Sequence, residues 1–327
     1  MTIKTTSQAF DELDENLKLD PRERARAIKI HNEITAALIK VQLAIAAFLQ
    51  GSFARKTMLA PLRDIDKVLI LAWDPNDKGP GSASRAAHKV AGTLRDLYPN
   101  HTVTIGKHCV KLELDSDDFT FDIVPAVETD DGTGDVWIID TEQDRWERSN
   151  TRTLISIIQQ RNQDCDGRWV RQVRFVKLFV REQLDGIVPG LHVEKYTWDS
   201  VKDNMPHDGA VAAILAKGAE LLAPGTTYTE PTGRDRIDHR LSTVDRQRAH
   251  TEFTRAAAAA AKAVTHARNG EHNAAIAIWH SLFGDDFSKP DERSAIKALD
   301  RGAGIAGTVT STAPVKAPKT RSWRPGA

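Results

Sequence analysis

Apolar residues recur at helical spacing through the first fifty residues of the chain. A short amphipathic helix is predicted within 5–20, where the apolar positions are Phe10, Leu13 and Leu17. Pro21 suits the first position of a second helix, because its fixed backbone angle is helical and its missing N–H is not needed there. Apolar residues then follow every three or four positions, which predicts one long helix over 23–49.

Alternation of apolar and polar residues replaces this pattern between about residues 64 and 140. One strand opens with Asp64 and Asp66 and runs to about residue 73. A helix is expected over 84–98, and further strands are expected at 101–105, 109–114, 119–124 and 136–140. These elements predict a mixed sheet with helices behind it, and hence an α+β fold.

The second half of the chain has helical periodicity and few strand signals. Helices are predicted at 151–162, 168–185, from 190 onward, and at 208–222, 237–266 and 273–283. Beyond Arg301 the sequence is rich in Gly, Ala, Thr, Ser and Pro and too poor in apolar residues to fold alone. We therefore expect 302–327 to be a flexible tail.

Composition limits the classes of protein to which the chain can belong. Its 327 residues include 45 basic and 45 acidic side chains, so no overall charge indicates a nucleic-acid or membrane-surface binder. The two cysteines, Cys109 and Cys165, have no metal-ligand spacing and fit a reducing compartment. The N-terminus lacks an apolar signal region and no apolar run is long enough to span a membrane, which predicts a cytoplasmic protein.

The chemistry centres on the stretch from Gly51 to Asp66. Side chains alternate along a strand, so Asp64 and Asp66 point to the same face. Two carboxylates at such a short distance repel each other unless a cation lies between them, and Mg²⁺ is the usual cation beside phosphates. Gly51 allows close backbone approach, the turn after Ser52 offers free N–H groups, and Arg55 adds positive charge. The stretch predicts a nucleotide site.

A third carboxylate follows in the strand at 119–124. Alternation places Asp122 with Thr120 and Val124, opposite Phe121 and Ile123. If this strand lies beside the first, Asp122 can face the same space and complete a two-metal site. A lone Gly-Ser turn or Asp-x-Asp pair is more often an ordinary solvated turn, so the specificity of the prediction comes from the combination and its order.

These residues resemble the polymerase-β-like nucleotidyltransferases, and within them the bacterial cGAS/DncV-like nucleotidyltransferases (CD-NTases). The family signature is a Gly-Ser turn, an Asp-x-Asp strand and a distal Asp, and the segments 122–126 and 279–287 also resemble this subgroup. One departure is Lys67, where a strand hydrophobe is commoner. The resemblance covers about residues 25–290. It implies a catalytic lobe (1–148, including the long N-terminal helix), a helical lobe (149–301) and an active-site cleft between them.

The resemblance also suggests roles for residues that local sequence leaves open. Ser149 and Asn150 lie where the family chain crosses between lobes and could line the nucleotide pocket, although a helix N-cap explains them equally well. Lys177 matches a family lysine that contacts triphosphate, while the sequence alone makes it an ordinary surface lysine. Ala327, at the end of the tail, matches a terminus that some family members conjugate through a ubiquitin-activating-type enzyme.

For function, the resemblance implies a cyclic di- or trinucleotide made from NTPs with two Mg²⁺ ions, or Mn²⁺ in their place. The product would bind a downstream effector in bacterial anti-phage signalling (CBASS). Three alternatives stay open: transfer of a single NMP to a small molecule, protein or RNA end; a nucleotide-binding module without turnover; and a double-stranded RNA or DNA sensor. The balanced charge and the lack of a Cys/His cluster favour no obligatory nucleic acid.

Overall fold

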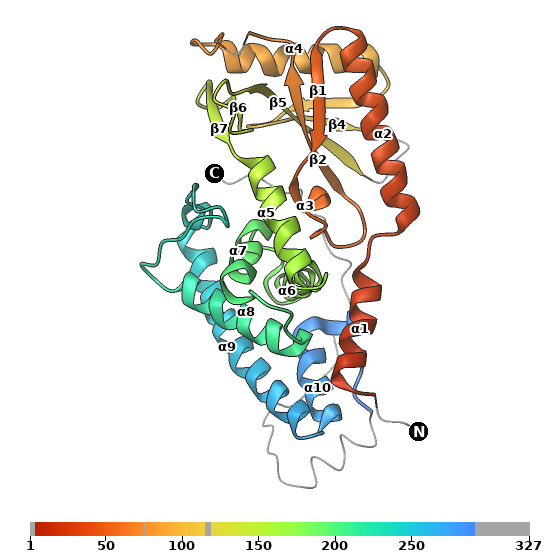
Figure 1. Cartoon of the computed structure of the whole chain (residues 1–327), viewed down its shortest axis with the longest axis vertical. Helices are drawn as coiled ribbons and strands as arrows, with labels where there is room; N and C mark the ends of the chain where they lie inside the picture. Colours follow the sequence, from red (N-terminus) through yellow and green to blue (C-terminus); the bar gives the residue numbers. More distant parts are fainter. Residues whose placement is uncertain (1–3, 75, 115–118, 292–327) are drawn as a thin grey trace.

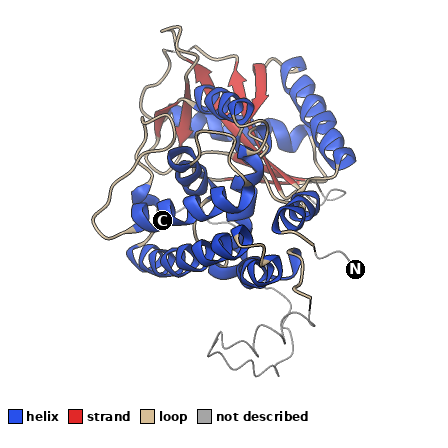
Figure 2. Ribbon diagram, turned by 60° about the horizontal axis from the view of Figure 1, so that its bottom comes forward, coloured by secondary structure: helices blue, strands red, loops and turns tan. Residues whose placement is uncertain are grey.

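The computed structural model describes residues 4–74, 76–114 and 119–291. The expected tail at 302–327, with Ala327, lies outside these residues. Figures 1 and 2 show the strands gathered at one end of the molecule and most helices at the other, which confirms the predicted α+β class.

The described chain contains one seven-stranded sheet and two sets of helices. The strands are β1 (Ala44–Leu49), β2 (Asp64–Leu71), β3 (Thr102–Ile105), β4 (Val110–Glu113), β5 (Thr120–Glu128), β6 (Val136–Asp140) and β7 (Arg145–Ser149). The helices beside the sheet are α2 (Pro21–Lys40), α3 (Gly51–Ala54) and α4 (Ser82–Leu97). The others are α1 (Thr6–Leu17), α5 (Thr151–Asp164), α6 (Trp169–Leu184), α7 (Gly190–Ser200), α8 (His207–Leu222), α9 (Thr243–Arg268) and α10 (His272–Phe283), with short 3₁₀ turns at Asp238–Arg240 and Gly284–Asp286.

The sheet is mixed, with strand order β1-β2-β5-β4-β3, and β6 and β7 extend from β5. The central pair, β2 and β5, is parallel, while the other pairs are antiparallel. One face is covered by α2 and α4, whose apolar side chains pack with Ile65, Leu69, Phe121 and Ile123. Side chains that alternate with these point to the opposite face.

The predicted long helix over 23–49 is wrong in its last third. α2 ends at Lys40, Gln42 takes a left-handed backbone conformation, and residues 44–49 form β1. The alanine-rich segment has no strong strand preference of its own, but it pairs with β2 along its length, with Ala47 opposite Leu69 and Phe48 opposite Val68. Tertiary pairing therefore overrides local helix propensity here.

Strand β7 was not predicted, and the predicted start of α9 is six residues too early, since the helix begins at Thr243 instead of residue 237. The other predicted strands between residues 101 and 140 are present, and so are the helices that begin near 151, 168, 190, 208 and 273.

Two large hydrophobic cores organise the described part of the chain. The first lies between the sheet and α2, α3 and α4, which together we call the sheet lobe. The second joins α5–α10 with α1, and we call these elements the helical lobe. Although residues 1–148 are expected to form one lobe, α1 lies with the helices because Phe10 packs edge-on against Trp279, Phe283 and Phe287.

Among the described residues, no helix combines the length and apolar character needed to cross a membrane.

Candidate active site

The three predicted carboxylates lie on neighbouring strands. Asp66 of β2 is the direct partner of Asp122 on β5, and Asp64 is the partner of Thr120, whose hydroxyl donates a 2.8 Å hydrogen bond to Asp64 Oδ1. Residues in register across a parallel pair point to the same face, so all three carboxylates face away from α2 and α4. The structure thus brings together the residues that sequence alternation selected.

Burial and mutual repulsion make this group electrostatically costly. Burial, with the charges of Asp122 and Asp64, raises the pKa of Asp66 to about 6, and Arg55 and Lys111 only partly offset this. Burial also raises the pKa of Asp122, against the attraction of Lys111. A cation bound among these groups would relieve both effects.

Lys111, which was not predicted as a site residue, lies between two of the carboxylates. Its Nζ is 3.8 Å from Asp64 Oδ1 and 3.6 Å from Asp122 Oδ1. Lys111 is the strand partner of Asp122 on β4, so this contact depends on sheet register. The pKa of Lys111 is raised because attraction from Asp122 and Asp64 outweighs the effect of burial. In the absence of a metal ion, Lys111 supplies part of the positive charge that these carboxylates need.

Gly51 and Ser52 begin α3 directly beside Asp66. Gly51 has φ +67°, a left-handed conformation, and a Cβ atom added to it would lie 1.8 Å from Asp66 Oδ2. The backbone N–H of Gln50 donates a 2.8 Å hydrogen bond to the carbonyl oxygen of Asp66. Glycine is therefore needed at this position both for its backbone conformation and for the space that the carboxylate occupies.

Arg55 and Lys177 meet at a buried glutamate, Glu194, which was not predicted as a site residue. Arg55 Nε donates to Glu194 Oε2 at 2.8 Å, and Lys177 Nζ donates to Glu194 Oε1 at 3.1 Å. The expectation of an ordinary surface lysine at 177 is wrong, because its side chain is only 11% exposed. Burial lowers the pKa of Lys177 despite the attraction of Glu194, since one carboxylate is shared by two cations.

Ser149 and Asn150 lie where the chain leaves the sheet. Ser149 ends β7, and Asn150 stands at the N-cap position of α5. The Asn150 side chain makes no capping bond; its Nδ2 donates a 2.5 Å hydrogen bond to Thr232 Oγ1 in the helical lobe. Asn150 therefore occupies the N-cap position as the alternative expected, but its side chain does not cap α5 and instead connects the two lobes.

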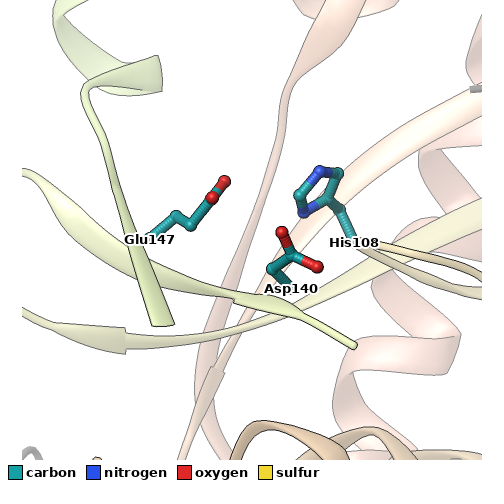
Figure 3. A group of neighbouring side chains, drawn as sticks. All are labelled: His108, Asp140 and Glu147. Atoms are coloured by element: carbon teal, nitrogen blue, oxygen red, sulfur yellow. The ribbon is translucent and has the colours of Figure 1, made fainter. Parts of the chain in front are cut away.

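A second group of side chains could hold a metal ion. His108, Asp140 and Glu147 have ligand atoms within 4.8 Å of one another, and within the part of the chain that the structure describes they form the one group at this spacing (Figure 3). Their charges already have partners: Lys107 Nζ lies 3.8 Å from Asp140, and Arg145 donates to Glu147 at 2.6 Å. His108 Nδ1 bonds the Ile139 carbonyl. This group has less unbalanced negative charge than the aspartates.

The aspartate site suits a hard divalent cation better. Its ligand atoms are carboxylate oxygens, and Asp122 Oδ1 is a buried oxygen without a hydrogen-bond partner. Lys111, 3.6 Å from that oxygen, is the nearby cation, and its flexible side chain can move aside. Such a site can stabilise phosphate charge and activate a hydroxyl group.

Comparison with known proteins finds similarity in both sequence and fold. The family model described as Second Messenger Oligonucleotide or Dinucleotide Synthetase domain matches residues 4–162. A probable cyclic nucleotide synthase of Bacillus cereus (strain VD146) is 22% identical over 282 residues, which cover 74% of this chain and 82% of that protein.

Solved structures share the fold across most of the chain. CdnC of E. coli MS115-1 with ATP superposes with a TM-score of 0.68 at 16% identity, over 87% of this chain and 99% of that one. The same protein in complex with HORMA-deltaN gives 0.69 at 14% identity, over 86% and 98%. The apo form of DncV from Vibrio cholerae gives 0.67 at 13% identity, over 88% and 97%.

Proposed function

Since the chain belongs, through residues 4–162, to the family of second messenger oligonucleotide or dinucleotide synthetases, we propose that it makes a cyclic di- or trinucleotide from NTPs and releases pyrophosphate. As a member of this family it is an enzyme, a nucleotidyltransferase. The observation that carries the proposal is the alignment of Asp64, Asp66 and Asp122 on one face of the parallel pair β2 and β5, beside the turn at Gly51.

Asp64, Asp66 and Asp122 would hold two Mg²⁺ ions, which Mn²⁺ can replace. The family is metal-dependent, and the unpartnered oxygen of Asp122 fits such an ion. When bound, the metal ions neutralise triphosphate charge and lower the pKa of the acceptor hydroxyl, so that it can attack the α-phosphate. Asp66 has to be ionised to take part; burial and the neighbouring carboxylates raise its pKa to about 6, and a bound cation would favour its ionised form.

Other side chains of the site bind and orient the nucleotides. Gly51 and Ser52 let the backbone approach the phosphates, and Arg55 and Lys177 contribute positive charge from the two lobes. Ser149 and Asn150, where the sheet gives way to α5, would line the pocket for the base or ribose. Repeating the transfer with donor and acceptor exchanged closes the ring.

The biological setting that we propose is anti-phage signalling in the cytoplasm, with an effector that binds the cyclic product. CdnC of E. coli MS115-1, a protein of similar fold, forms a complex with HORMA-deltaN, and a protein partner for this enzyme is part of the proposal. Conjugation of the tail at Ala327 by a ubiquitin-activating-type enzyme is a further part of it, and it concerns residues outside those described.

The test is incubation of the purified protein with the four NTPs and Mg²⁺ or Mn²⁺, followed by phosphatase treatment and mass spectrometry. We expect a phosphatase-resistant product of cyclic mass that Asp64→Asn reduces by at least about 10²-fold. Asp96→Asn is the matched control, because Asp96 is an exposed carboxylate on α4. A linear or tethered product would favour single NMP transfer, and nucleotide binding without pyrophosphate release would favour a binding module.

A further inference from the structure

The carboxylate of Glu194, on α7 of the helical lobe, is fully buried against a segment of the sheet lobe. Arg55 approaches it with two nitrogen atoms, Nε at 2.8 Å and an Nη at 3.4 Å. The Thr57 hydroxyl donates to Glu194 Oε1 at 2.6 Å. Glu194 therefore holds two side chains of residues 51–57, the segment that begins with Gly51 and Ser52.

Lys177 on α6 completes this group. Its Nζ donates to Thr57 Oγ1 at 3.0 Å and to Glu194 Oε1 at 3.1 Å. Gly190 at the start of α7 provides the space, because a Cβ atom there would lie 2.8 Å from Lys177 Cε. A buried charge is tolerated only with good partners, and Glu194 has three. Arg55 and Lys177 together lower the pKa of Glu194 to about 2, against the effect of burial.

The other end of the same segment touches the reaction centre. Gly51 packs against the Asp66 carboxylate, and Gln50 bonds the Asp66 backbone. The segment is internally connected, because the N–H of Arg55 donates to the Gly51 carbonyl at 3.2 Å and the N–H of Thr57 to the Ser52 carbonyl at 3.0 Å. A displacement at residues 55–57 is therefore transmitted to Gly51 and Asp66.

We propose that Glu194 is a positioning residue through which the helical lobe fixes residues 51–57 against Asp66. Its effect on turnover depends on the proposed function, but its effect on the segment does not. Helix α3 has only four residues, and its own hydrogen bonds are too few to fix it. The contacts from Glu194 supply the order that the short helix lacks.

Amide hydrogen exchange on the full chain tests the structural step. In Glu194→Gln, we expect the amides of Arg55 and Thr57 to exchange at least about tenfold faster, because hydrogen bonds to a buried charged group are lost. Amides of the central strand β5 are expected to keep their rates. Glu220→Gln is the matched control, since Glu220 pairs with Lys217 and its side chain is 63% exposed.

Pyrophosphate release tests the catalytic step. We expect Glu194→Gln to lower kcat at least about tenfold and to change KM less, because Asp66 is misplaced while most nucleotide contacts remain. Thr57→Val is expected to give a smaller loss, and the double variant is expected to be no worse than Glu194→Gln alone, because Thr57 acts through Glu194.

Three results would overturn the proposal. The first is an unchanged amide exchange rate at 55–57 in Glu194→Gln, and the second is faster exchange there with an unchanged kcat. The third is a double variant whose loss of kcat equals the product of the losses in Glu194→Gln and Thr57→Val. If Glu194→Gln does not fold, Thr57→Val gives the exchange result, since it removes an uncharged partner from the same carboxylate. If the wild-type chain makes no product with any NTP and either metal ion, turnover does not test Glu194, and exchange still decides whether Glu194 holds the segment.

Discussion

Asp66 and Asp122 are direct partners across the parallel strands β2 and β5, so that two carboxylates meet on one face of the sheet. Burial raises the free energy of the ionised form of both residues, and the charge of Asp122 adds to this at Asp66. The arrangement destabilises the metal-free protein. We interpret this cost as the consequence of a site built for cations.

The first prediction concerns stability in EDTA. The pKa of Asp66 is raised from its ordinary value of 3.8 to about 6 in the folded chain. Between these values the folded state binds more protons, so Asp66 makes stability fall as pH rises from about 4 to 6. We expect Asp66→Asn to raise the free energy of unfolding at pH 7.5 by up to about 3 kcal/mol, as measured by urea denaturation. Addition of Mn²⁺ is expected to stabilise the wild type and not the variant; a variant less stable than wild type in EDTA would contradict this reasoning.

The second prediction uses two glycines with similar backbone conformations. Gly51 has φ +67° and Gly225 has φ +79°, but only at Gly51 would a Cβ atom meet a side chain, that of Asp66. We expect both alanine variants to lose about 1 kcal/mol of stability from the left-handed backbone, and Gly51→Ala to lose more because its Cβ overlaps Asp66. Only Gly51→Ala is expected to lose pyrophosphate release, by at least about 10²-fold. Calorimetry and an activity assay measure the two effects. Equal activity in the two variants would show that the space beside Asp66 is unimportant.

The third prediction concerns Lys111, whose ammonium group lies beside Asp64 and Asp122. Removing a nearby positive charge strengthens the attraction of these carboxylates for a divalent cation. We expect Lys111→Met to tighten Mn²⁺ binding by about tenfold, measured by titration calorimetry at pH 8, above the raised pKa of Asp66.

Lys107→Met is the matched control for Lys111, because Lys107 lies beside Asp140 in the group that includes His108 and Glu147. If the metal binds at the aspartates, Lys107→Met leaves Mn²⁺ affinity unchanged. Tighter binding in Lys107→Met alone would place the ion at His108, Asp140 and Glu147 instead.

The sequence was sufficient to place Asp64 and Asp66 on one face, because strand alternation is a local property. It also selected Asp122, although only the β2–β5 register shows that Asp122 lies opposite Asp66. Lys111 could have been found by the same alternation in β4, but its significance depends on which strand β4 joins. The carboxylates were thus predictable as a set, and their partners were not.

The errors have a common physical cause, which is dependence on distant contacts. Residues 44–49 have helical spacing and become a strand because β2 offers a partner. Glu194 is an ordinary polar residue of a helix in sequence, and its burial against Arg55 and Thr57 arises only when the two lobes meet. Lys177 is misjudged for the same reason. Local periodicity carries no information about contacts more than a hundred residues apart.

Lys67 is an unusual residue for a central strand such as β2, because it is a lysine where a hydrophobic side chain is commoner. Lys67 is fully buried on the face opposite the aspartates, where its Nζ donates to Thr35 Oγ1 at 2.8 Å and to the His31 carbonyl at 3.2 Å. Burial lowers its pKa from 10.5 to about 7. Between these values the unfolded chain binds more protons, so stability attributable to Lys67 rises with pH from about 7 to 10.

We therefore expect Lys67→Met to raise the free energy of unfolding at pH 7 by about 1–3 kcal/mol and to flatten its pH dependence between pH 7 and 10. The His31 carbonyl keeps a donor in the variant, because the Thr35 hydroxyl also donates to it at 2.7 Å. Urea denaturation across this pH range is the measurement. Lys29→Met is the control, since Lys29 is 77% exposed on the same helix, α2, that Lys67 contacts. A less stable Lys67→Met variant would show that the two hydrogen bonds of the lysine outweigh the cost of its burial.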